Sequence, residues 1–177
     1  LCDLISEVRY IGEIGLDATP KCRPSLDNQQ DVFCRVLSAC GKGGGRILSI
    51  HSRRAASAVL DSLEAFPDAG TPVLHWFSGT ANELRRAVDL GCWFSVGPAM
   101  LASTKGCGLA RTMPKDRILT ETDGPFASRQ GVPLMPWDVK EAVLGLAEIW
   151  GVTGSEASSQ VMENFRRLLK ERPQTTI

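Results

Sequence analysis

The sequence has 177 residues, of which 43% are hydrophobic, and its 20 basic and 20 acidic side chains give a net charge of zero. This length predicts one domain with a proper hydrophobic core, covering residues 1–177. The neutral balance argues against a protein that coats nucleic acid through bulk electrostatics. The longest apolar run is shorter than the roughly 18 residues that a membrane-spanning helix needs, so we expect no membrane segment.

Apolar, strand-like runs alternate along the chain with segments of helical periodicity. Strands are expected at residues 9–14, 46–50, 72–75, 92–96 and 117–122. Helices are expected at residues 28–40, 56–66, 81–90, 137–150 and 155–169, with a weakly helical, glycine-broken stretch at 101–113. Nearly continuous apolar strands separated by helices predict a parallel sheet that is buried on both faces.

Local signals predict where several helices begin and end. Thr80 with Glu83, and Thr153 with Glu156, have the spacing of capping boxes, in which side chain and backbone groups satisfy each other at a helix start. Glycines are expected to end three helices, at Gly41, Gly91 and Gly151.

Two α/β architectures fit this alternation, the doubly wound sheet and the TIM-like (β/α)8 barrel. A dinucleotide-binding doubly wound sheet would carry a G-x-G-x-x-G turn after its first strand, and the sequence has none. A barrel needs eight strands and typically about 250 residues, so about 70 residues would be absent here. Because the chain starts at Leu1 and not at Met, we expect a barrel that lacks its N-terminal strands.

The cysteines and the start of the chain bear on the compartment. Six scattered cysteines include no C-x-x-C pair and fit neither a disulfide framework nor a zinc finger. Residues 1–4 have neither the charged nor the apolar region of a secretion signal. We therefore expect reduced thiols and a cytoplasmic protein.

Four residues at or near strand ends could bind metal. The only two histidines, His51 and His75, follow or close the second and third expected strands, Glu13 lies inside the first, and Asp123 closes the last. The carboxyl ends of parallel strands meet at one rim of a barrel. A buried carboxylate such as Glu13 needs a cation or several donors to stay ionised, and its flanking glycines permit close approach or a bulge. Each residue alone also fits an ordinary structural role, but together they favour a site for zinc, manganese or magnesium.

Four segments in sequence order, residues 12–17, 51–53, 75–79 and 121–125, resemble signature segments of the TatD family of metal-dependent deoxyribonucleases. Residues 51–55 and 91–98 further resemble the TatD-like nuclease of Qat anti-phage systems. The resemblance implies a barrel enzyme that hydrolyses DNA phosphodiester bonds with two divalent ions. It also implies exonuclease action on single-stranded ends and partner proteins in a defence system.

The resemblance implies a role for each matching residue. Glu13 would bridge the two ions, His51 and His75 would hold one of them, and Asp123 would help to hold the other. Arg53 would contact the substrate phosphate or hold a neighbouring carboxylate. Together, the residues implied in catalysis are Glu13, Asp123 and Arg53.

Other residues would support the ligands or the substrate. Those implied to orient ligands or shape the adjoining loop are Asp17, Glu121 and Ser78. Arg53 and Arg54 follow the second expected strand, and Trp76 and Phe126 also lie just after strands, so these four residues could contact substrate. Trp76 and its neighbour Phe77 could equally pack in the core.

One departure from the family pattern concerns the second ion. The family begins with a strand that ends in His-x-His, and this chain has no such pair. Either the segment lies upstream in the natural protein, or the chain is a remnant with an incomplete site and little nuclease activity. Alternative functions are hydrolysis of a small molecule or an aminoacyl-tRNA ester, and a non-catalytic role in an anti-phage assembly.

Overall fold

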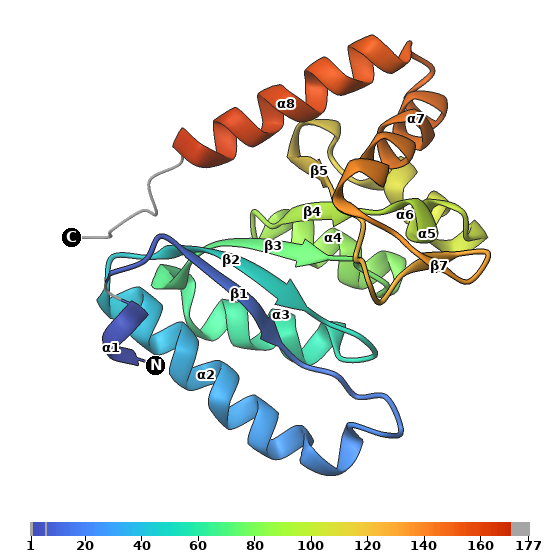
Figure 1. The fold of residues 1–177 in the computed structure, drawn as a ribbon. Coiled ribbons are helices and arrows are strands. Elements are labelled where there is room, and N and C mark those ends of the chain that lie inside the picture. Colours follow the sequence, from blue (N-terminus) through green and yellow to red (C-terminus); the bar gives the residue numbers. More distant parts are fainter. Residues whose placement is uncertain (1, 6, 171–177) are drawn as a thin grey trace. The chain divides into compact units, whose positions relative to one another are not determined.

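The computed structural model describes residues 2–5 and 7–170, without the side chains of residues 2 and 3. These residues form two compact units, one ending at Trp93 and the other comprising Phe94–Lys170 (Figure 1). Five parallel strands alternate with helices, which confirms the predicted α/β class. A single domain over residues 1–177 stays a prediction.

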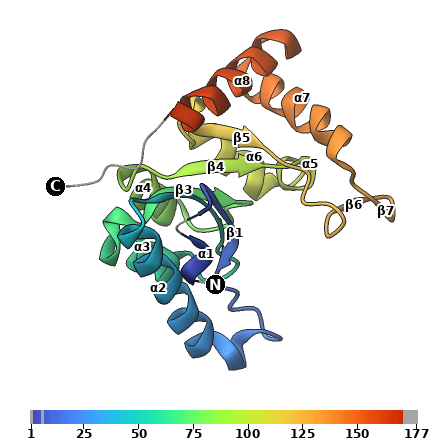
Figure 2. The ribbon, with the colours of Figure 1, turned by 60° about the vertical axis from the view of Figure 1, so that its left-hand side comes forward.

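The first unit is a three-stranded parallel sheet with its helices. Its strands are β1 (Tyr10–Gly15), β2 (Arg46–His51) and β3 (Gly70–His75). Its helices are α1 (Cys2–Ile5), α2 (Leu26–Lys42), α3 (Ala56–Ala65) and α4 (Ala81–Asp89), with 3-10 turns η1 (Arg23–Ser25) and η2 (Pro67–Ala69). Strand β2 pairs with β1 on one side and β3 on the other. Helices α2 and α3 lie along the same face of this sheet (Figures 1 and 2).

Strand β1 contains a bulge at the position of its acid. Ile11 pairs with Leu48 and Ile14 pairs with Ile50, so three steps along β1 oppose two steps along β2. The bulge therefore falls on Gly12 and Glu13, as one interpretation of the glycines predicts. A bulge changes the direction in which its side chains point, and here it accompanies a Glu13 carboxylate that reaches the end of β2.

Helix α2 continues past the residue that was expected to stop it. The backbone does not leave the helix at Gly41 but at Gly43, whose N–H donates to the carbonyls of Ala39 and Cys40. A side chain at position 43 would come within 2.7 Å of the Arg46 guanidinium, so the glycine lets that buried cation reach the helix end. The prediction at Gly41 is wrong because glycine is tolerated inside a helix whose packing is otherwise favourable.

The second unit begins within β4 (Trp93–Val96) and pairs that strand in parallel with β5 (Ile118–Thr120). Its helices are α5 (Pro98–Leu101), α6 (Thr104–Thr112), α7 (Val139–Trp150) and α8 (Gly154–Lys170), with η3 (Lys115–Arg117) and η4 (Pro136–Asp138). A small antiparallel hairpin consists of β6 (Ser128–Arg129) and β7 (Val132–Pro133). The weakly helical stretch expected at 101–113 contains helix α6, which begins after α5 has ended and is capped by Ser103, whose hydroxyl accepts the Gly106 N–H at 3.0 Å.

A buried amide joins α8 to the start of β5. Asn164 has no exposed surface, and its Nδ2 donates to the carbonyls of Lys115 and Ile118, both at 2.8 Å. Its own carbonyl oxygen accepts from Gln160 at 2.8 Å. Both amide hydrogens of this buried side chain are therefore used to hold α8 against the segment that leads into β5.

The remaining local predictions have mixed outcomes. Both capping boxes are present, at Thr80 with Glu83 and at Thr153 with Glu156. Gly151 caps α7 in the left-handed conformation, as predicted. Cys40 and Cys92 are buried thiols, while the side chain of Cys2 lies outside the described residues. None of the helices in the described part of the chain combines the length and the apolarity required to cross a membrane.

Candidate metal centre

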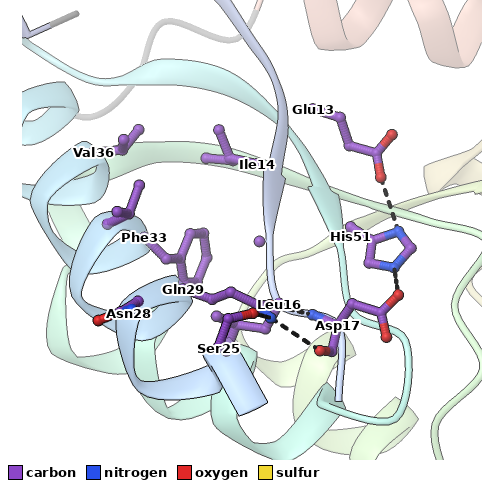
Figure 3. Close-up of a pocket in the computed structure, with 12 residues that line it drawn as sticks. Glu13, Ile14, Leu16, Asp17, Ser25, Asn28, Gln29, Phe33, Val36 and His51 are labelled. Carbon is purple, nitrogen blue, oxygen red and sulfur yellow. Dashed lines mark hydrogen bonds and ion pairs between the residues drawn. The ribbon is translucent and has the colours of Figure 1, made fainter. Parts of the chain in front are cut away.

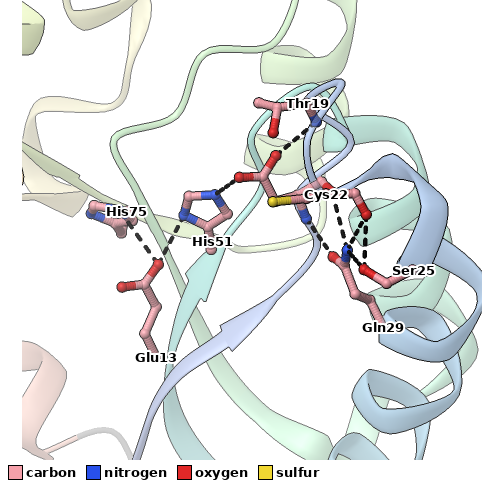
Figure 4. A network of polar contacts seen from close by, with 8 residues as sticks. Glu13, Thr19, Cys22, Ser25, Gln29, His51 and His75 are labelled. Atoms are coloured by element: carbon pink, nitrogen blue, oxygen red, sulfur yellow. Dashed lines mark hydrogen bonds and ion pairs between the residues drawn. The ribbon is translucent and has the colours of Figure 1, made fainter.

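Three side chains converge where the first three strands end. His51 and His75 are the last residues of β2 and β3, and Glu13 reaches them from the bulge of β1 (Figure 4). Glu13 Oε1 lies 2.8 Å from His51 Nδ1 and 3.6 Å from His75 Nε2. One ligand atom from each residue lies within 4.8 Å of the other two. Parallel neighbours place their ends at one sheet edge, which is why residues so distant in sequence meet here.

The donor set of this triad suits a first-row divalent cation. It offers two imidazole nitrogens and a carboxylate oxygen, and zinc sites with three protein ligands keep a fourth position for water or substrate. The two rings are stacked, with centroids 5.7 Å apart and planes inclined by 29°. His75 is nearly buried at 11% exposure, whereas Glu13 is 48% exposed, so the carboxylate side of the triad is open to incoming groups.

Asp17 contacts the opposite nitrogen of the His51 ring. Its Oδ2 lies 3.5 Å from His51 Nε2, and its Oδ1 accepts the Thr19 N–H at 2.7 Å (Figure 4). Burial raises the pKa of Asp17, but the hydrogen bonds from Thr19 and the charges of His51 and Arg53 outweigh burial and lower that pKa below its usual value. Asp17 is therefore a carboxylate at neutral pH, placed to accept the Nε2–H of His51.

A glycine brings Asp17 to this position. Gly15 has a φ of +126°, a conformation that L side chains rarely adopt, and a Cβ there would clash with the His51 carbonyl oxygen. That same carbonyl accepts the Leu16 N–H at 3.0 Å. The chain consequently turns closely around the end of β2, and Asp17 follows two residues later.

Two members of the triad, Glu13 and His51, border a cavity of about 570 Å³ between β1 and α2 (Figure 3). Glu13, Asp17 and His51 lie at its polar end, and Phe33 and Val36 contribute to its apolar wall. Val32 of α2 also lines this cavity and is exposed.

The loops after β2 and β3 carry the other residues implied in the first unit. Arg53 and Arg54 are exposed, and Arg54 adopts a positive φ of 56°. Trp76 is half-buried. Phe77 is 1% exposed and therefore packs in the core, which was one of the two roles that the sequence left open for it. Ser78 is half-buried beside it.

The residues implied in the second unit follow β5. Ser95 on β4 donates a short hydrogen bond from its hydroxyl to the carboxylate of Glu121. Asp123 has a positive φ of 53°, and its carbonyl accepts the Ala127 N–H at 2.8 Å. Phe126 is 90% exposed. That Asp123 joins the triad in one site stays a prediction.

Sequence reasoning missed the residues that hold the loop after β1. Gln29 on α2 bonds to the backbone of Asp17, and Thr19 bonds to its side chain. A glutamine in the first turns of an amphipathic helix has the pattern of an ordinary surface residue, so the sequence carried no signal for it.

Comparison with known proteins gives consistent matches over most of the chain. The profile of the family described as "TatD related DNase" matches residues 3–170. Human "Deoxyribonuclease TATDN3" is 26% identical over 162 residues, which is 89% of this chain and 58% of that protein. The metal-dependent hydrolase YabD of Bacillus subtilis is 32% identical over 170 residues, which is 93% of this chain and 66% of that protein. This chain thus spans less than two thirds of the length of either relative.

Solved structures show the same fold. The crystal structure of YjjV, a TatD homologue from Escherichia coli, superposes with a TM-score of 0.81 at 25% identity, covering 94% of this chain and 69% of that one. An amidohydrolase from Saccharomyces cerevisiae superposes with a TM-score of 0.83 at 16% identity, over 94% of this chain and 68% of that one. The predicted relation to barrel hydrolases is confirmed by these matches.

Proposed function

This chain belongs to the TatD family, and on that basis we propose that it hydrolyses DNA phosphodiester bonds with the help of divalent metal ions. The observation that carries the proposal is the triad of Glu13, His51 and His75, whose ligand atoms lie within 4.8 Å of one another. The human relative's description as a deoxyribonuclease supports DNA as the substrate class.

In the proposed site, His51 and His75 would hold one ion, Glu13 would bridge it to a second, and Asp123 would help to hold that second ion. Both ring contacts of Glu13 use Oε1. Magnesium, manganese and zinc are each compatible with this donor set. Such ions supply water activation and neutralise charge on phosphate oxygens.

The chain's own side chains would orient ligands and bind the substrate. Asp17 Oδ2 lies 3.5 Å from His51 Nε2 and would orient the ring when His51 binds an ion. Arg53 contributes a positive charge that stabilises the Asp17 carboxylate, and its exposed guanidinium is also suited to a phosphate oxygen. Three further residues are proposed to contact DNA: Arg54, Trp76 and Phe126. Glu121 and Ser78 are proposed to orient groups around the site.

The proposal is tested by metal uptake and DNA degradation with a matched pair of variants. Wild-type protein should take up Zn²⁺ or Mn²⁺ in a calorimetric titration and shorten labelled single-stranded DNA when Mg²⁺ or Mn²⁺ is added. We expect slow turnover, because both histidines of this chain are assigned to one ion. Glu13→Gln should abolish uptake and turnover, whereas Glu7→Gln, at another exposed glutamate of the first unit, should change neither. Equal activity in Glu13→Gln and wild type would refute the bridging role.

A substrate panel separates this function from its alternatives. Single-stranded and double-stranded DNA, small carboxylic esters and an aminoacyl-tRNA should be compared under the same metal conditions. Cleavage of an ester without cleavage of DNA would favour the alternative function, hydrolysis of a small molecule or of an aminoacyl-tRNA ester. Labelling the DNA at its 5′ or 3′ end would show whether degradation proceeds from an end, as we propose.

We also propose that the protein acts in the cytoplasm together with partner proteins of an anti-phage defence system. The support is the resemblance of residues 51–55 and 91–98 to the TatD-like nuclease of Qat systems. Cell fractionation, and a phage-infection assay with and without Glu13→Gln, test these two points. Protection that survives the substitution would point to a non-catalytic role in the assembly.

A further inference from the structure

We propose that Gln29 is a positioning residue, which fixes the loop between β1 and α2 so that Asp17 stays against Nε2 of His51. The proposal concerns the ring of His51 in the protein with or without metal. Only its consequence for metal affinity rests on the proposed function.

One side chain holds the backbone of Asp17 at both of its polar groups. Gln29 Oε1 accepts the Asp17 N–H at 2.7 Å, and Gln29 Nε2 lies 3.2 Å from the Asp17 carbonyl oxygen (Figure 3). The same Nε2 lies 3.1 Å from the Cys22 carbonyl and 3.0 Å from Ser25 Oγ. The carboxamide thus hydrogen-bonds to backbone groups at both ends of this loop, at Asp17 and at Cys22.

The residue at the N-cap of α2 is turned toward the loop and toward Gln29. Ser25 occupies the N-cap position, and in the part of the chain that the structure describes it makes no side-chain capping hydrogen bond. Its hydroxyl donates instead to the Cys22 carbonyl at 2.8 Å and accepts from Gln29. Because the capping residue is turned toward the loop, the connection between loop and helix depends on the glutamine.

By holding this loop, Gln29 should also influence the candidate metal centre. Once its backbone is fixed, Asp17 places Oδ2 at 3.5 Å from His51 Nε2, while Glu13 Oε1 lies at the other ring nitrogen. A carboxylate on the far nitrogen of a metal-binding histidine sets the direction of the ring. Gln29 would therefore act on the ring through Asp17, without touching metal or substrate.

The adjacent glutamine provides a matched control. Gln30 lies on the same helix, but its amide donates to Ser62 Oγ at 2.7 Å and to Cys34, away from the loop. Substituting Gln30 removes a comparable side-chain hydrogen bond from α2 and leaves the contacts of Asp17 in place.

The decisive experiment is nuclear magnetic resonance of the histidine rings in metal-free protein. The chain has two histidines, so the ring ¹⁵N signals can be assigned with a single His51→Gln variant. Gln29→Leu should shift the His51 ring signals in the same direction as Asp17→Asn, and Gln30→Leu should leave them unchanged. If Gln29 merely stabilised the helix, Gln29→Leu would lower the melting temperature without moving these signals.

A second measurement tests the consequence for metal binding. Zn²⁺ affinity should fall by about tenfold in Gln29→Leu, the lower end of the range for losing a group that orients a ligand. Gln29→Glu keeps an acceptor for the Asp17 N–H but loses the donor to the carbonyls, so its affinity should be intermediate. Gln30→Leu should bind as wild type does.

The outcomes separate this inference from the proposed function. If wild-type protein binds no Zn²⁺, the metal site is refuted, and the ring signals still decide the role of Gln29. If Gln29→Leu does not fold, Gln29→Glu carries the same comparison. Unchanged His51 signals in every folded Gln29 variant would overturn the proposal.

Discussion

A single carboxylate oxygen, Oε1 of Glu13, faces a ring nitrogen of each histidine in the chain. The grouping could be predicted because His51 and His75 end neighbouring parallel strands, whose ends share an edge. Their role as ligands stays a prediction. The loop that holds Asp17 could not be predicted, since its bonds to Gln29 depend on where α2 packs and on no local pattern.

Phe126 offers a test of DNA binding that does not depend on the metal. Its side chain is 90% exposed, so its removal should cost little stability. If bases stack on it, Phe126→Ala should weaken binding of a short single-stranded oligonucleotide by about 1–3 kcal/mol. Fluorescence anisotropy in the Glu13→Gln background measures this without cleavage. Val132→Ala, at another exposed apolar residue of the same unit, is the control.

Helix α6 contains two glycines with opposite expected effects. A Cβ at Gly106 would clash with the Met100 carbonyl, whereas a Cβ at Gly108 meets nothing within 4 Å. Gly108→Ala should therefore raise the free energy of unfolding by about 1 kcal/mol, the difference in helix propensity. Gly106→Ala should lower it, and urea denaturation of both variants measures the pair. Equal effects would contradict the packing described for α5 and α6.

The capping box of α8 should make stability depend on pH. Hydrogen bonds from the backbone and side chain of Thr153 lower the pKa of Glu156 below its usual value. A carboxyl group with a lowered folded pKa stabilises the protein above its unfolded pKa, and this contribution is lost as the pH falls through the folded pKa. Glu156→Gln should therefore lower the melting temperature at pH 7 and have a smaller effect at pH 3.

A control on the same helix isolates the cap. Glu163 lies 4.0 Å from Arg166 on the exposed surface of α8. Glu163→Gln should change the melting temperature little at pH 7, because exposed ion pairs contribute little. A pH-independent loss in Glu156→Gln would mean that the carboxylate does not act as the cap.

Elements with strong local signals were predictable, and those set by packing were not. The capping boxes and Gly151 define helix ends through bonds between neighbouring residues. The end of α2 at Gly43, by contrast, has no capping pattern in the sequence, and a side chain there would come within 2.7 Å of the buried Arg46 guanidinium. The β6–β7 hairpin was not predicted from the sequence, because each of its strands has only two residues. Its turn residues Gln130 and Gly131 nevertheless have the positive φ angles that a two-residue hairpin turn requires.

At the scale of the molecule, metal binding should stabilise the fold through the first unit. A ligand that binds the folded state alone adds about 2.7 kcal/mol at a free concentration one hundred times its Kd. Zn²⁺ should therefore raise the wild-type melting temperature and slow amide hydrogen exchange at the ends of β1, β2 and β3. Glu13→Gln should show neither effect, and an equal shift in that variant would place the ion elsewhere.

The α/β class followed from the alternation of apolar runs and helical segments, because parallel strands joined by crossover helices are largely apolar. The extent of a domain is a different matter. It depends on how β4 and the helices after it pack, and this is not encoded in local periodicity.

Asn164 makes the last helix indispensable to the strand that precedes Asp123. Shortened versions that stop before α8 would lose the hydrogen bonds to the main-chain oxygens of Lys115 and Ile118, each of which contributes about 0.5–1.5 kcal/mol. A shortened protein for crystallisation or fusion should therefore end after Lys170. In a mutational scan, even Asn164→Asp should be destabilising, because a carboxylate cannot donate a hydrogen bond to these carbonyls.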